Sequence, residues 1–197
     1  MTPPLIVFLL AVVIPVFFSK IRAAPLWLVI QALALGWNAV AHHGLDSAHA
    51  LIAVLELLLL RAAIAPLLLR RAIRQRAQPN LDLMPSNLFT WVAATTLMVL
   101  AFKFGAPSMG DKQALTLGVV GATVAVALLL LATNDAPPAQ LVAVLFMENA
   151  LALFESLFPE PWPLPVHGAL SAIYLLTTFV GTWLIGTHDA PAAEEPA

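Results

Sequence analysis

Apolar residues form seven long runs along this 197-residue chain, separated by short stretches that contain Pro, Asn and Asp. Each run approaches the ~20 residues that a helix needs to cross a bilayer, the first, second and fourth being slightly short. Because a backbone in lipid must satisfy its own hydrogen bonds, and because no run alternates as a barrel strand would, all seven are predicted to be helices. The predicted helices cover residues 4–18, 26–41, 48–69, 88–104, 114–132, 141–158 and 166–185.

The composition is typical of a polytopic membrane protein. The chain is 61% hydrophobic and only 10% charged, whereas soluble domains carry about 25% charged residues. The predicted fold class is therefore all-α, a polytopic membrane helix bundle of seven transmembrane helices. We expect a single transmembrane bundle over residues 1–187 and a short acidic cytoplasmic tail over 188–197. This layout leaves no room for a separate soluble catalytic domain, and no basic stripe indicates nucleic acid as a partner.

Positive charge predicts how the bundle is oriented in the membrane. The loops after the first and third runs share one side if the spans alternate, and they hold Lys20, Arg22, Arg70, Arg71, Arg74 and Arg76. The other side has only Lys112, with Lys103 near the end of the fourth run. Since cytoplasmic loops are enriched in Lys and Arg, the basic side is predicted to be cytoplasmic. We expect a multi-pass protein of the cell inner (cytoplasmic) membrane, with the N-terminus outside and the C-terminus in the cytoplasm.

Glu148 lies at the centre of the apolar segment 140–159. A charged carboxylate at that depth costs ~3 kcal/mol on insertion scales, so ionisable groups there are usually functional. A carboxyl group in such surroundings can take up or release a proton near neutral pH. Glu155 is seven residues further on, which places both carboxylates on one helix face, about 10 Å apart in height. The alternative is that Glu155 is interfacial and that Glu148 only hydrogen-bonds a neighbouring helix.

Glu56 and Arg61 also lie well inside a predicted span. Five residues separate them, or roughly 140° around an α-helix, so each is expected to find its partner on another helix. Arg61 stays charged in any site and can stabilise the ionised form of a nearby carboxylate or act as a gate. The alternative is that it snorkels toward the headgroups. Lys103 is expected to pair with Glu155, because both lie near the same membrane boundary. This set of charges suits a protein that handles protons.

Histidines occur at two places near predicted helix ends. His167 opens the last span and is either a proton-accessible group or a simple cap. A second group, at the turn after the second span, consists of His42, His43, Asp46 and His49. Its spacing matches no defined metal motif, so a solvated turn is favoured over a metal or haem site. The chain has no cysteine, which excludes disulfides and Cys-ligated clusters. No metal and no cofactor are predicted, and any redox centres belong to other subunits.

Residues 145–155, with the Met-Glu-Asn step at 147–149, and residues 48–74 resemble hydrogenase-4 component E. That family is related to the K subunit of respiratory complex I and the C subunit of multisubunit cation/proton antiporters. The resemblance implies a membrane-arm subunit that helps to translocate protons or cations beside antiporter-like subunits and a hydrogenase module, in the lipid bilayer. It implies no catalytic turnover by this chain alone, which would be a non-catalytic subunit of a membrane oxidoreductase complex.

The resemblance assigns the glutamate of the proton-handling helix to Glu148. Arg61 stands where the family usually has a lysine, and His167 and Tyr174 stand near the positions of acidic residues in the family's last helix. The proton pathway expected from the sequence thus comprises Glu148, Glu155, Glu56, Arg61, Lys103 and His167. The alternative is a non-conducting assembly subunit whose charges dock larger antiporter-like partners. A stand-alone transporter is disfavoured because no inverted repeat is evident.

Overall fold

The computed structural model describes residues 2–44, 48–75, 81–84, 87–105, 111–158 and 162–187. The predicted acidic tail at 188–197 lies outside the described residues. The described part is all-α, with one isolated bridge between Lys20 and Asp82. Its elements are α1 (Pro3–Phe18), the short 3₁₀ turn η1 (Ile21–Ala23), α2 (Ala24–His43), α3 (Ala48–Leu57), the π-helix η2 (Leu58–Ile64), α4 (Ala65–Arg74), α5 (Leu88–Gly105), α6 (Asp111–Thr133), α7 (Pro137–Glu155) and α8 (Leu164–Thr187).

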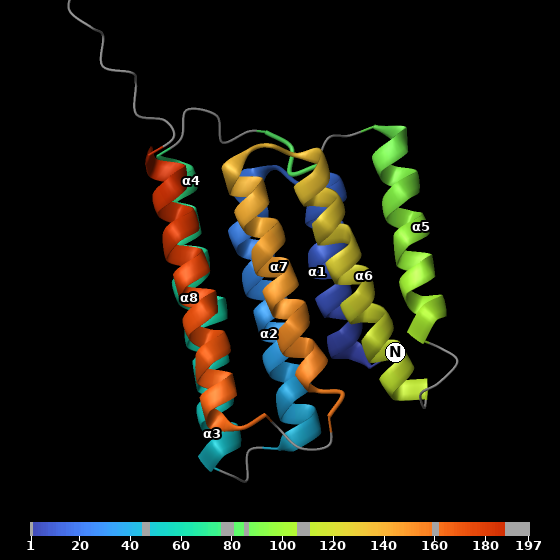
Figure 1. Cartoon of the computed structure of the whole chain (residues 1–197), viewed down its shortest axis with the longest axis vertical. Coiled ribbons are helices and arrows are strands. Elements are labelled where there is room, and N and C mark those ends of the chain that lie inside the picture. Colours follow the sequence, from blue (N-terminus) through green and yellow to red (C-terminus); the bar gives the residue numbers. More distant parts are fainter. Residues whose placement is uncertain are drawn as a thin grey trace, which may run out of the picture.

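The helices form two facing layers (Figure 1). One layer contains α1, α2 and the continuous rod α3–η2–α4, and the other contains α6, α7 and α8. Each helix of the first layer packs against a helix of the second that runs in the same direction: α1 against α6, α2 against α7, and α4 against α8. Helix α5 stands at one edge and packs on α6. Every predicted span therefore corresponds to one helical rod.

Among the described residues, five helical stretches are long and apolar enough to cross a membrane, which agrees with the predicted helical membrane bundle. They are Ile21–His42, Leu51–Arg74, Lys112–Thr133, Pro137–Glu155 and Pro165–Thr187. Two shorter apolar helices, Pro3–Phe18 and Leu88–Phe104, correspond to the first and fourth predicted spans. The sequence had indicated that both were slightly short for a bilayer.

Proline explains where several helices begin. Helix α7 starts at Pro137, four residues before the predicted start at residue 141, and α1 and α2 also have proline in their first two positions. Proline suits that place because the N–H groups of the first helical turn have no partner within the helix, so the N–H that proline lacks is not missed. The predicted starts at residues 26 and 141 were late because they followed the apolar pattern and assigned Pro25, Pro137 and Pro138 to turns.

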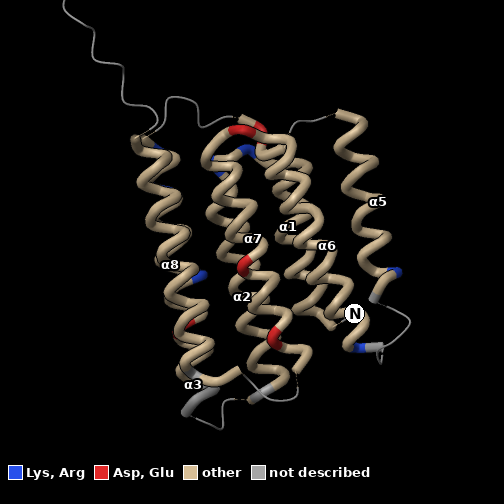
Figure 2. The backbone as a smooth tube through the Cα atoms, viewed as in Figure 1, with Lys and Arg blue, Asp and Glu red and all other residues tan. Residues whose placement is uncertain are grey.

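The basic loops meet at one end of the bundle, which we call the basic end (Figure 2). The Ile21 N–H donates to the Leu81 carbonyl at 2.9 Å, and the Leu83 N–H donates to the Ser19 carbonyl at 3.1 Å. The Asn134 amide, from the α6–α7 turn, donates to the Leu83 carbonyl at 2.7 Å. The segments that follow α1 and α4 therefore lie side by side, as alternating spans require.

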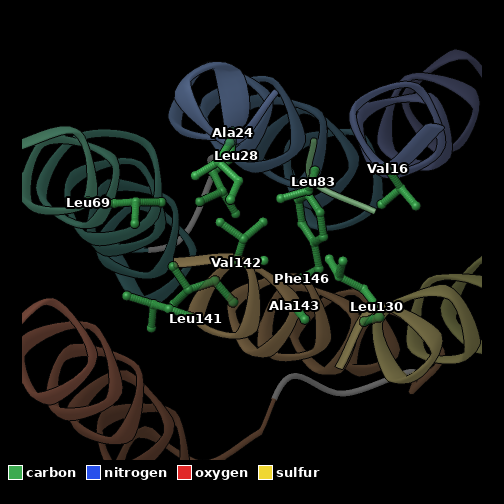
Figure 3. Close-up of a cluster of buried hydrophobic side chains, with 14 of the residues drawn as sticks. Val16, Ala24, Leu28, Leu69, Leu83, Leu130, Leu141, Val142, Ala143 and Phe146 are labelled. Carbon is green, nitrogen blue, oxygen red and sulfur yellow. The ribbon is translucent and has the colours of Figure 1, made fainter. Parts of the chain in front are cut away.

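Two clusters of buried apolar side chains hold the layers together. The larger, which we call the apolar half, lies mainly at the basic end and draws on α1, α2, α4, α6, α7 and α8. Figure 3 shows Leu28, Leu69, Val142 and Phe146 pointing toward one another between the layers. The smaller cluster joins α1, α2, α6 and α7 nearer the opposite end. Neither cluster fills the space between α3 and α8 at that end.

Candidate functional site

A cavity of about 300 Å³ lies between α2, α3–η2, α7 and α8, in the half of the bundle away from the basic end. We call it the polar cavity. Most of its wall is apolar, and five of the six residues expected to form a proton pathway line it: Glu56, Arg61, Glu148, Glu155 and His167. Glu148 and Glu155 thus face the same space, which confirms their predicted position on one face of their helix.

The π-helix η2 brings Glu56 and Arg61 to the same cavity. Ala65, at its end, donates its N–H to the carbonyl of Leu60, five residues back. Such a turn is wider than an α-helical turn, because each of its hydrogen bonds spans five residues. The following Pro66 has no N–H to donate, and proline is a common cause of such irregularity. Both side chains line the polar cavity, although a regular α-helix would set them roughly 140° apart.

Arg61 is a buried cation with direct partners on two other helices, α7 and α8. Its guanidinium donates from Nη1 to Oδ1 of Asn149 at 2.8 Å, and its side chain lies 4.2 Å above the centre of the Tyr174 ring. Asn149 in turn donates from Nδ2 to Oε1 of Gln31 at 2.7 Å. The residue is only 8% exposed. Snorkelling toward the headgroups is therefore excluded, and the prediction that Arg61 looks to another helix is confirmed.

His167 stands between two carboxylates. Its Nε2 is 3.4 Å from Oε2 of Glu56, and its Nδ1 is 3.5 Å from Oε2 of Glu155. Glu155 also accepts the Trp162 backbone N–H at 3.0 Å. An imidazole can take a proton on one nitrogen and release one from the other. This arrangement links α3 to the end of α7 through a group that can pass a proton between them.

Glu148 lies deeper in the cavity, where its carboxyl group interacts with the Thr177 side chain of α8. Its Oε2 is buried and has no hydrogen-bond partner among the described residues. The same holds for three other buried atoms of cavity-lining residues: Glu56 Oε1, Asn38 Nδ2 and Tyr174 Oη. A cavity of this size with several polar partners can hold ordered water. Water would then connect Glu148 to the Glu56–His167–Glu155 group.

Lys103 does not join this site. It is exposed on α5, which packs against α6, and it forms no ion pair with Glu155, whose carboxylate turns toward His167. The expected pairing was wrong because a similar depth in the membrane does not place two side chains on neighbouring helices.

Most of the histidine-rich turn lies outside the described residues, namely Asp46 and the side chains of His43 and His49. Within the described residues no group of His, Asp and Glu has the arrangement of a metal site.

Three polar residues of the site did not stand out in the sequence: Gln31, Asn38 and Asn149. Each is fully or almost fully buried in a helix of a mostly apolar bundle. A signal was present, because amides are rare inside apolar spans and hydrogen-bond across helices there. They were missed because only charged residues within the apolar runs were taken as candidates.

Comparison of the chain with protein-family models, with curated proteins and with solved structures found no match.

Proposed function

We propose that this chain is a membrane-arm subunit of a hydrogenase-4 or complex I-like assembly, in which it contributes to proton or cation translocation. The observation that supports the proposal most directly is the polar cavity. Glu56, Glu148, Glu155 and His167 come from three different helices, and all line one space beside a buried arginine. Ionisable groups inside a membrane are costly and usually mark an ion or proton route. The resemblance of residues 48–74 and 145–155 to component E agrees with this role.

The chain by itself would supply only half of such a route. The polar groups end at the Arg61–Asn149–Gln31 hydrogen bonds, and beyond them Leu28, Leu69 and Val142 are completely buried in an apolar cluster. A proton that reached Glu148 would therefore have to leave sideways or through a partner. That requirement favours a subunit of a larger assembly over a stand-alone transporter.

In this proposal all seven apolar helices cross the inner membrane, with the N-terminus outside and the C-terminus in the cytoplasm. The basic end then faces the cytoplasm, as the distribution of Lys and Arg favours. The polar cavity lies in the outer half of the membrane. The broad apolar surfaces of α5 and α8, which include Phe89 and Phe179, are available for lipid and for antiporter-like partner subunits.

The decisive experiment replaces Glu148 by Gln, which preserves size and hydrogen bonding but cannot titrate. In the reconstituted complex we expect normal subunit composition and a loss of most proton translocation, by tenfold or more if Glu148 is on the only route. Asp82→Asn is a matched control, because Asp82 is exposed at the basic end and its change also turns a carboxylate into an amide. Wild-type translocation by a correctly assembled Glu148→Gln complex would overturn the proposal.

The second candidate function is a non-conducting assembly subunit. It is favoured by the apolar half, because the described residues there provide no polar route to the basic end. In that case Glu148→Gln should leave translocation unchanged, since the amide still hydrogen-bonds. Substitutions on the exposed apolar face of α5, such as Phe89→Ser, would instead reduce the amount of assembled complex.

A further inference from the structure

A second hollow lies at the basic end, on the outside of the bundle, between α2 with η1 and the η2–α4 rod. It is a groove of about 620 Å³. We call it the arginine groove, because three of the residues that line it are Arg22, Arg70 and Arg74. The rest of its wall is made of Ala, Val, Leu, Ile and Pro side chains. It is separate from the polar cavity and shares no lining residue with it.

The two ends of the arginine groove differ in chemistry. The arginines lie where α4 ends and α2 begins, and the deeper part is lined by Val29, Ala62 and Ala63. Residues 62 to 74 span about 18 Å along a helix, close to the ~15 Å that is half the hydrocarbon thickness of a bilayer. The groove thus runs from the headgroup region to about the middle of the membrane, with a cationic end and an apolar end.

The three arginines have no partner in the described part of the chain. None of them makes a side-chain hydrogen bond or an ion pair there, and all three side chains are exposed. The two described acidic residues at this end, Asp82 and Asp135, do not line the groove. A guanidinium offers a planar fork of donors that matches a phosphate group. Three such groups around an apolar groove therefore fit an anionic headgroup that carries an acyl chain.

We propose that the arginine groove binds one anionic phospholipid of the leaflet at the basic end. Its phosphate would lie among Arg22, Arg70 and Arg74, and one acyl chain would lie along Val29 and Ala63. The charge of the groove, its length and the exposure of its lining residues Leu26 and Leu67 on the outside of the bundle select this ligand. Basic pockets between transmembrane helices are known to take such headgroups. The inference rests on the membrane location of the bundle and is independent of any role in proton translocation.

The test is native mass spectrometry of the purified full-length chain, delipidated and then mixed with phosphatidylglycerol or phosphatidylcholine. We expect one phosphatidylglycerol per chain to remain bound under activation that strips phosphatidylcholine. The Arg70→Gln/Arg74→Gln variant should bind phosphatidylglycerol about thirtyfold more weakly. The matched control is Lys20→Gln/Arg71→Gln, which removes the same charge from the same end at residues that do not line the groove. It should retain the lipid.

A second variant tests the apolar end without changing charge. Ala63→Phe fills the deep part of the groove and should also displace the lipid, and circular dichroism checks that the variant is folded. Inorganic phosphate in excess should not displace phosphatidylglycerol if the acyl chain contributes. The proposal is overturned if both lipids bind equally, if the two double variants lose lipid equally, or if phosphate alone competes fully. The first two outcomes would mean that the arginines act only as general surface charge or that they bind an acidic protein segment.

Discussion

Helix α7 passes through two regions of opposite character. In the apolar half its Val142 and Phe146 are completely buried among aliphatic side chains. Within one further turn Glu148 faces the polar cavity, and Asn149 accepts a hydrogen bond from Arg61. The boundary between the regions is therefore sharp, and it is formed by the Arg61–Asn149–Gln31 hydrogen bonds.

The difference shows how this bundle can hold charge within a bilayer. Helices in lipid associate mainly by close packing and interhelical hydrogen bonds, because lipid tails are as apolar as leucine. The apolar half supplies the packing. The polar cavity supplies partners and room for water, without which buried ionisable groups would be too costly. Packing in the apolar half stabilises the helix arrangement on which the polar cavity depends. The following substitutions separate the two contributions.

The largest effect is expected in the apolar half. Phe146→Ala should reduce the free energy of unfolding by about 4 kcal/mol, because it leaves a hole in a closely packed core. Phe179→Ala is the matched control: Phe179 is 66% exposed on α8, so its loss should change stability by less than about 0.5 kcal/mol. Reversible unfolding in mixed detergent micelles measures both. Equal effects would mean that the apolar half is not a packed core.

At the boundary, Asn149→Leu should cost about 3 kcal/mol, since it leaves the buried Arg61 guanidinium without its acceptor. Asn149→Asp keeps the acceptor for Arg61 and adds an opposite charge. It can no longer donate to Gln31 Oε1, but the Gln31 amide can turn so that its Nε2, which has no described partner, donates to the new carboxylate. The variant should therefore recover most of the loss. The same unfolding measurement compares the two variants. If Asn149→Leu is as stable as the wild type, Arg61 must find another acceptor, and the boundary is not held by this hydrogen bond.

Inside the cavity, the interactions of His167 with Glu155 and Glu56 should be weaker. Double-mutant cycles that combine His167→Leu with Glu155→Gln or with Glu56→Gln should each give a coupling energy of about 1 kcal/mol. The similar distances of 3.5 and 3.4 Å favour similar couplings. A coupling near zero in both cycles would show that His167 does not link the two carboxylates.

The apolar pattern was sufficient to place every helix. The predicted spans 88–104 and 114–132 differ from α5 (Leu88–Gly105) and α6 (Asp111–Thr133) by at most three residues at either end. The pattern was sufficient because a backbone in lipid must form either helices or a closed barrel, and no run alternates as a barrel strand would. The same reasoning found the buried charges, since a charged residue in an apolar run is conspicuous.

Which charges meet was harder to predict. The π-helix η2, which contains Arg61, depends on a local hydrogen-bond pattern that periodicity does not reveal. The order of the helices in the two layers decides that Glu155 meets His167 and not Lys103. That order depends on packing between helices far apart in the sequence. A single sequence predicts the depth of each side chain in the membrane, but it does not predict which neighbouring helix that side chain faces.

The smallest effects give the finest comparison, because two buried hydroxyl groups without described partners lie in the two environments. Thr123 Oγ is buried within α6, among packed side chains, and Tyr174 Oη borders the polar cavity. Thr123→Val should stabilise the bundle by about 1 kcal/mol, because it removes a buried polar atom that has no partner. Tyr174→Phe should instead destabilise it by about 1 kcal/mol, because cavity water can hydrogen-bond the hydroxyl. Unfolding of both variants in the same micelles provides the test. Opposite signs would mean that the cavity is hydrated and the packed interior is dry, whereas a stabilising Tyr174→Phe would mean that no water reaches the hydroxyl beside Arg61 and Glu148.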